Sequence, residues 1–198
     1  MDSRNRLISA LDTFAQRRRK GSLSKKHVVP LVEFAAAEFR GRGVDAGEIK
    51  REKVCGRYYK RKVDLVVETR RGVEILVFII TQSGSVRKNL NNRRRDIIGD
   101  SVNLRAAHPN AKLGLIYLLR SDREATRRSK AGTSPIDELA LFFQDLLAAG
   151  SQRAALLDAA ALLAADCDAG GRIRIEKVPD DVDVLGNFFG RLLVPASA

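Results

Sequence analysis

Residues 73–81, with the sequence VEILVFIIT, restrict the fold of this chain more than any other segment. Almost every side chain in this run is β-branched or large and apolar, which favours a β-strand. A strand with one face in water alternates apolar and polar side chains, and this run does not, so both of its faces are expected to be covered. Helices on both sides of a sheet provide that cover. The segment therefore predicts a central strand in an α/β domain.

The neighbouring segments extend this prediction to a single domain over residues 1–198. A charged turn at 70–72 joins the central strand to a strand at 62–68 and so makes a hairpin. The other expected elements are helices at 4–19, from Ser24 to just before Gly41, at 88–107, 135–150, 152–166 and 184–194, and strands at 53–59, 112–120 and, at a sheet edge, 171–178. This order predicts a mixed central sheet flanked by helices, with N-terminal helices and C-terminal helical additions.

The charge of the chain is large, and it is distributed unevenly. The formal net charge is +12: the N-terminal helices (1–50) carry +5, the α/β core (51–130) carries +12, and the C-terminal part (131–198) carries −5. Such an excess of positive charge favours a polyanionic partner, namely DNA, RNA or an anionic membrane surface. Because the excess lies in residues 51–130, the partner is expected to bind there and not at the acidic C-terminal part.

Polar residues recur at fixed spacing around the central strand. In chain order they are Asp64, Thr81, Gln82, Ser85, Lys88, Asn89, Asn91, Asn92, Arg93, Asp96 and Gly99. In this order and spacing, over roughly residues 60–120, the chain resembles the core of one group of type II restriction endonucleases of the PD-(D/E)XK superfamily. The resemblance implies a restriction-endonuclease-like fold. It also implies a metal-binding aspartate, here Asp64, on the first hairpin strand and a Glu-x-Lys pair on the second.

The chain departs from the family at its catalytic centre. Phe78 and Ile80 occupy the positions of the family's Glu and Lys, and Arg95 replaces one acid of a helical pair of which Asp96 keeps the other. Magnesium-dependent hydrolysis needs at least two oxygen ligands and a nearby cation. Residues i and i+2 of a strand face the same side, so Phe78 and Ile80 place hydrocarbon beside Asp64. The resemblance therefore implies an inactive pseudoenzyme that uses no metal cofactor, with Asp64 as a relic.

Three other interpretations stay open. The motif match can be chance in an unrelated α/β domain. The protein can be an active magnesium-dependent endonuclease whose ligands have moved, with Lys88 as the cation and carboxylates from Glu33, Glu38, Glu68, Glu74 or Asp96. It can also be a basic RNA-binding protein. Magnesium is a cofactor only in the second case.

The residues expected to bind DNA form three groups. They are Arg87, Lys88, Asn89, Asn91, Asn92, Arg93, Arg94 and Arg95 on the helix at 88–107; Arg57, Lys60, Arg61 and Lys62 before the hairpin; and Arg127 and Arg128 in a charged loop at 121–134. Lysine and arginine neutralise phosphates, and asparagine either reads adenine edges or caps a helix N-terminus. Some of the cations are equally explained as a solvated helix face. Tyr58 and Tyr59, beside the second group, can stack or contact phosphates but are expected mainly to pack in the core.

The leading hypothesis is a double-stranded DNA-binding protein that regulates transcription or serves as a non-cutting subunit. Cys55 and Cys167 make neither a disulfide framework nor a zinc site, so a reducing bacterial cytoplasm is expected, with the protein on the nucleoid. No apolar run reaches the length of a membrane span, so no membrane partner is expected. The acidic, Ala/Leu-rich segment 135–167 predicts either a homodimer contact or two helices that simply cover the sheet.

Overall fold

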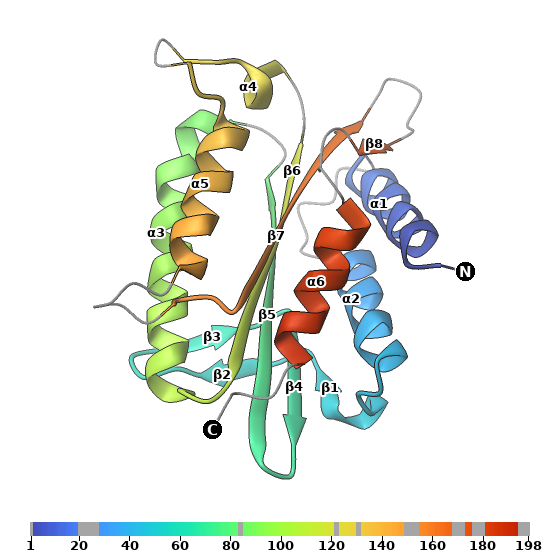
Figure 1. The fold of residues 1–198 in the computed structure, drawn as a ribbon, viewed down its shortest axis with the longest axis vertical. Coiled ribbons are helices and arrows are strands. Elements are labelled where there is room, and N and C mark those ends of the chain that lie inside the picture. The colour runs from blue at the N-terminus through green and yellow to red at the C-terminus, as the bar shows by residue number, and fades with distance from the viewer. Residues whose placement is uncertain are drawn as a thin grey trace.

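The computed structural model describes residues 2–19, 28–82, 85–120, 123–129, 132–148, 155–167, 173–175 and 181–193. These residues form three layers, with a sheet between two layers of helices (Figure 1). One face carries α3 (Val86–Ala107) and α5 (Pro135–Leu147), and the other carries α1 (Ser3–Arg19), α2 (Val29–Gly41) and α6 (Asp181–Leu193). The expected α/β architecture, a mixed sheet flanked by helices, is confirmed.

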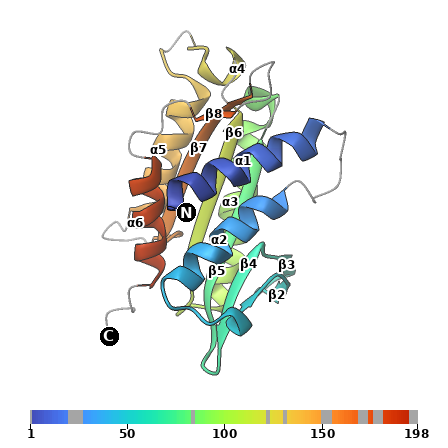
Figure 2. The same ribbon diagram turned by 90° about the vertical axis from the view of Figure 1, so that its right-hand side faces the viewer.

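The central sheet has six strands among the described residues. Their order across the sheet is β1 (Ile49–Lys50), β4 (Leu65–Thr69), β5 (Gly72–Gln82), β6 (Lys112–Arg120), β7 (Ala159–Cys167) and β8 (Ile173–Ile175) (Figure 2). β5, β6 and β7 are parallel, and the remaining neighbours are antiparallel. A separate two-stranded sheet joins β2 (Lys53–Cys55) to β3 (Lys60–Lys62). A 3₁₀ turn, η2 (Ala46–Glu48), and a one-turn helix, α4 (Arg123–Thr126), complete the fold.

β5 is the central strand that its sequence predicts. Ile75, Val77 and Ile79 are buried in the apolar cluster shared with α1, α2 and α6. Leu76 and Phe78 are buried in the second cluster, on the side of α3 and α5. Both faces of the strand are therefore covered, and the hairpin with β4 forms through the expected turn.

The prediction of a helix at 152–166 is wrong. Within the described residues this segment contains β7, which pairs in parallel with β6 from Gly114↔Ala159 to Arg120↔Ala165. Alanine and leucine have high intrinsic helix propensity. The pairing and burial of this segment in a parallel sheet outweigh that propensity. The start of the expected helix, residues 151–154, lies outside the described residues.

The alanines of β7 have a packing role that explains the strand. Ala159, Ala161 and Ala165 are buried beneath the helical layer that contains α6. On the neighbouring strand, a Cβ at Gly114 would lie 2.8 Å from both Phe188 and Leu192 of α6. Small residues on β6 and β7 therefore let α6 pack closely on the sheet.

The other differences are smaller. The strand expected at 53–59 ends at Cys55, the one expected at 62–68 begins as β4 at Leu65, and the loop at 121–134 contains α4. The helix expected from Ser24 is α2, and Ser24 itself lies outside the described residues. The edge strand and the final helix are confirmed as β8 and α6. Of the two helices expected at 135–167 as a homodimer contact, only the first is a helix, α5, and the second segment contains β7. Self-association stays a prediction.

No helix in the described ranges combines the length and apolar character that crossing a membrane requires.

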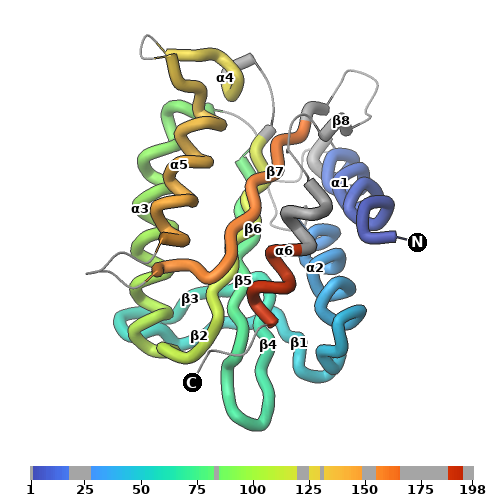
Figure 3. The backbone as a smooth tube through the Cα atoms, viewed as in Figure 1, coloured from blue at the N-terminus to red at the C-terminus, as the bar shows by residue number. Residues whose placement is uncertain are grey.

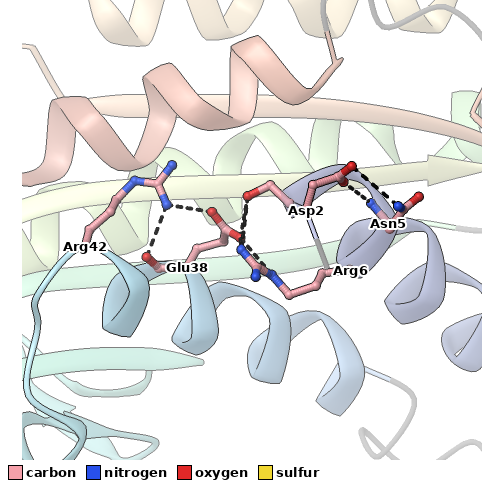
Figure 4. A network of polar contacts seen from close by, with 6 residues as sticks. Asp2, Asn5, Arg6, Glu38 and Arg42 are labelled. Atoms are coloured by element: carbon pink, nitrogen blue, oxygen red, sulfur yellow. Dashed lines mark hydrogen bonds and ion pairs between the residues drawn. The ribbon is translucent and has the colours of Figure 1, made fainter.

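A buried carboxylate joins the N-terminal helices. Glu38 of α2 is only 1% exposed, and its oxygens accept hydrogen bonds from Ser3 and Arg6 of α1 and from Arg42, each at 2.6 Å (Figure 4). Burial alone would raise the pKa of Glu38, but these hydrogen bonds and the charge of Arg42 outweigh it, so the pKa lies below its ordinary value. Glu38 is therefore ionised in the folded protein and holds α1 against α2.

The stabilising effect of Glu38 should depend on pH. Because its pKa is lowered by folding, its contribution is complete above the ordinary value of 4.5 and is lost as the pH falls through the folded pKa. We expect Glu38→Gln to lower the free energy of unfolding by about 2 kcal/mol at pH 7, and by less below pH 4.5. Urea denaturation of both proteins at several pH values measures this difference. A difference that stays constant with pH would contradict the role of the charge.

Candidate nucleic-acid interface

Asp64 lies just before β4 and makes internal contacts. Its Oδ2 accepts the backbone N–H of Ile79 at 3.0 Å, where the pairing of β4 with β5 ends. Its Oδ1 lies 3.4 Å from the guanidinium of Arg51. Phe78 is buried in the cluster on the α3 side of the sheet, and Ile80 packs against that cluster. The carboxylate thus caps the strand pairing and is neutralised by an arginine.

This arrangement does not suit a divalent cation. A magnesium site needs several oxygen ligands that converge on one point. Among the residues that the structure describes, no three His, Cys, Asp or Glu side chains lie together in a way that could hold a metal ion. Four of the five carboxylates considered for relocation are engaged elsewhere: Glu38 with α1, Glu68 with Lys50, Glu74 with Thr69, and Asp96 with Arg93. The fifth, Glu33, is exposed on α2.

α3 presents one group of the expected DNA-binding residues on its outer face. Lys88, Asn91, Asn92 and Arg95 are exposed and follow the i, i+3, i+4, i+7 spacing of a single helix face. Because α3 begins at Val86, the asparagines lie inside the helix, and N-capping does not explain them. Arg87 and Lys88 are in the first turn, which contains no acid, although the helix dipole disfavours cations there.

The second group lies beside the C-terminal half of α3. β2 and β3 form a hairpin that packs against this part of the helix (Figure 3). Residues 53–62 of the hairpin contain five Lys/Arg and no Asp or Glu. Arg57, Lys60 and Lys62 are exposed, whereas Arg61 lies 2.8 Å from the carboxylate of Asp100.

Asn103 of α3 holds the turn at 56–59 in place. Its Oδ1 accepts the backbone N–H groups of Tyr58 at 2.8 Å and Tyr59 at 3.2 Å, and its Nδ2 donates to the carbonyl of Tyr59 at 3.0 Å. Gly56 lies so close that a Cβ there would be 2.1 Å from the same side chain. The amide of Asn103 therefore fixes the turn of the basic hairpin on the helix, together with the contacts of Tyr59 and Arg61 to Asp100.

The third group lies at the opposite end of α3. Arg87 donates a hydrogen bond to the carbonyl oxygen of Arg127 at 2.7 Å, so the segment after α4 contacts the start of the helix. Arg127 and Arg128 are both exposed. All three groups expected from the sequence therefore lie along α3, whose 22 residues span about 33 Å.

Two of the expected residues serve the protein itself. Arg94 donates to the carbonyl of Glu138 in α5 at 2.9 Å, and its guanidinium lies over the ring of Phe142. Arg61 neutralises Asp100, and burial raises the pKa of Asp100 although the charge of Arg61 opposes this shift. We define the basic face by the other expected cations except Arg87, which donates to the carbonyl of Arg127. They are all exposed: Arg57, Lys60, Lys62, Lys88, Arg93, Arg95, Arg127 and Arg128.

The expectation that Tyr58 and Tyr59 pack mainly in the core is wrong. Tyr58 is 73% exposed and Tyr59 is 46% exposed. The hydroxyl of Tyr59 donates to Asp100 at 3.0 Å, whereas the turn presents the ring of Tyr58 to solvent between Arg57 and Lys60. The hairpin has only three residues in each strand, so it cannot bury two aromatic rings against α3.

Gly99 is an exposed glycine near the middle of α3. Glycine in a helix interior costs about 1 kcal/mol relative to alanine. Nothing inside the protein requires it, because a Cβ at Gly99 would meet only the hydroxyl of Tyr59, at an ordinary distance of 3.8 Å. Packing within the described structure therefore does not account for this glycine.

No family model matches the chain, and neither a curated protein nor a solved structure matches it significantly.

Sequence reasoning missed the residues that hold this face together. Asn103, Gly56 and Asp100 lie far apart in the sequence and belong to no motif. The one available signal was weak: Asn103 and Asp100 are poor helix formers that occupy inward positions of a long helix. No pattern in the sequence indicated that Arg51 pairs with Asp64.

Proposed function

We propose that this protein binds double-stranded DNA through the basic face without cutting it, and that its domain is restriction-endonuclease-like. The observation that carries the proposal is the alignment of three separate basic segments along α3, on one side of the sheet. The eight exposed cations of the basic face lie within these segments, and Asp96, an exposed acid of α3, pairs with Arg93 at 3.4 Å. A polyanion would neutralise this excess.

The dimensions of the basic face support a duplex as the polyanion. The length of α3, about 33 Å, is close to one turn of B-form DNA, about 34 Å. The cations of Arg127 and Arg128 at one end and of the hairpin at the other would thus meet phosphates about one turn apart. The exposed Asn91, Asn92 and Arg95 between them are residue types that read adenine and guanine edges.

The surroundings of Asp64 support binding without hydrolysis. Phe78 and Ile80 lie on the second strand of the β4–β5 hairpin, where the resemblance implies the Glu-x-Lys pair. Asp64 lies directly before the first strand, one residue short of the strand on which the resemblance implies the aspartate. Hydrocarbon and Arg51 occupy the surroundings that a metal and its water would need. Occupancy of DNA, in transcription regulation or as a non-cutting subunit, is the role that we propose.

The salt dependence of binding tests this proposal. If six cations meet phosphates, for example Arg57, Lys60, Lys62, Lys88, Arg95 and Arg128, the plot of log K against log salt should have a slope of about −5. Fluorescence anisotropy with a labelled mixed-sequence duplex, from low to physiological salt, measures the slope. Tighter binding of a structured RNA competitor would favour an RNA-binding protein instead.

A cleavage assay tests the enzymatic alternative. We expect no loss of supercoiled plasmid with Mg²⁺ or Mn²⁺, because within the described residues Asp64 belongs to no group of three side chains that could hold a metal ion. The wild-type protein and Asp64→Ala should be equally inert. Cleavage that disappears in Asp64→Ala would overturn the proposal in favour of an active endonuclease.

A further inference from the structure

An apolar strip crosses the basic face, and its members are Tyr58, Ile98, Gly99 and Val102. Ile98 and Val102 are 40% and 41% exposed, one helical turn apart on α3. We include the exposed Tyr58 because its backbone is hydrogen-bonded to Asn103, the residue that follows Val102 on the helix. Large apolar side chains at this exposure are unusual on a surface that is otherwise charged.

The position of Tyr58 is set by the fold. The turn at 56–59 is closed by a hydrogen bond from Gly56 N to the carbonyl of Tyr59 at 3.1 Å, and Arg57 N donates to the backbone carbonyl of Asn103 at 3.0 Å. With the contacts from the amide of Asn103, this leaves the backbone of the turn little freedom. An exposed ring on a fixed turn loses little conformational entropy when it binds a partner.

The charges around the strip favour a nucleic acid as the partner. Arg57 and Lys60 flank Tyr58, and Arg95 lies one turn before Gly99 on the same helix. Of the two acids of α3 near the strip, Asp100 is buried and pairs with Arg61, and the exposed Asp96 pairs with Arg93 at 3.4 Å. A protein partner that covered this strip would have to cover these cations as well, whereas a duplex would neutralise them.

We propose that the strip forms the salt-independent part of the duplex interface, with the ring of Tyr58 against the sugars and base edges of a groove and Gly99 at the closest approach of α3 to the DNA backbone. This inference rests on the proposed function and deepens it. A side chain at residue 99 would then separate the helix from the DNA. The absence of that side chain explains why a helix-weakening residue occupies the centre of α3.

Substitution at Tyr58 tests the ring. Tyr58→Ala should weaken duplex binding about 5- to 10-fold at every salt concentration and leave the salt slope unchanged, because the lost contact carries no charge. Tyr58→Phe should bind like the wild type. Leu141→Ala, which removes a 57% exposed apolar side chain from α5, is the matched control and should have no effect. Wild-type affinity in Tyr58→Ala, or a changed slope, would overturn the inference.

The chain contains no tryptophan, which gives an independent measurement. In Tyr58→Trp the new side chain is the sole indole, and its emission should change on addition of duplex, with saturation at the dissociation constant found by anisotropy. Emission that does not respond while anisotropy reports binding would contradict a contact at residue 58.

Substitution of Gly99 by alanine should increase thermal stability and decrease DNA affinity. Gly99→Ala should raise Tm by about 2–4 °C, because alanine favours the helix and has room. It should also weaken DNA binding about 3- to 10-fold. Gly190→Ala on α6, another exposed helical glycine with open space, lies on the opposite side of the sheet and should raise Tm without a change in binding.

The outcomes separate the two proposals. If the wild-type protein does not bind duplex in a salt-dependent way, the proposed function fails and the inference fails with it. If the wild type binds with a steep salt slope and either Tyr58→Ala or Gly99→Ala binds as well as the wild type, the inference alone fails.

Discussion

Reversal of two charges on α3 should reduce duplex affinity about 100-fold at 0.1 M salt. Lys88 and Arg95 lie seven residues apart on the exposed face of the helix, so the double variant Lys88→Glu/Arg95→Glu removes two phosphate contacts from one surface. With a slope of about 0.9 per contact, each contact contributes roughly 8-fold at this salt concentration, and the new carboxylates add repulsion. The salt slope should also become shallower by about 2.

A matched control separates local contacts from total charge. Arg4 on α1 and Arg40 on α2 are exposed on the other side of the sheet. The double variant Arg4→Glu/Arg40→Glu changes the net charge by the same four units and should bind DNA within about 3-fold of the wild type. Equal losses in the two double variants would show that binding follows net charge alone, and the basic face as defined would have to be abandoned.

Among substitutions at this face, loss of the Asn103 side chain should lower the stability of the protein most. Asn103→Ala leaves the backbone N–H groups of Tyr58 and Tyr59 without their acceptor and removes one of the two hydrogen bonds to the carbonyl of Tyr59. Because the site is partly buried, we expect a loss of about 2–3 kcal/mol, or a decrease in Tm of roughly 5–10 °C. Thermal denaturation followed by circular dichroism measures this change.

The same variant should weaken DNA binding, because the hairpin would no longer be held on α3. Asn92→Ala is a suitable control for stability, since Asn92 is exposed on the same helix and its removal should change Tm by less than about 2 °C. If Asn103→Ala unfolds at the wild-type temperature, the hydrogen bonds of this amide do not fix the hairpin.

Part of the interface was predictable because it is local. Lys88, Asn91, Asn92 and Arg95 share one face of a helix, and helical periodicity is visible in the sequence. The bonds that hold the hairpin were not predictable, because Asn103 acts on residues more than forty positions away. The exposure of Tyr58 followed from the same long-range packing.

The sequence by itself determined the central strand. A continuous run of β-branched and large apolar side chains, as at 73–81, is typical of a strand that is buried on both faces. It also determined the helix that follows and the concentration of charge in the middle third. Only the tertiary structure decided the conformation of the alanine-rich segment that forms β7. The intrinsic preference of alanine for a helix is weak compared with tertiary interactions, so pairing with the edge of β6 and the close packing of α6 outweigh it. For the same reason, the neighbours of Asp64 and Asn103 follow from the path of the chain and not from local pattern.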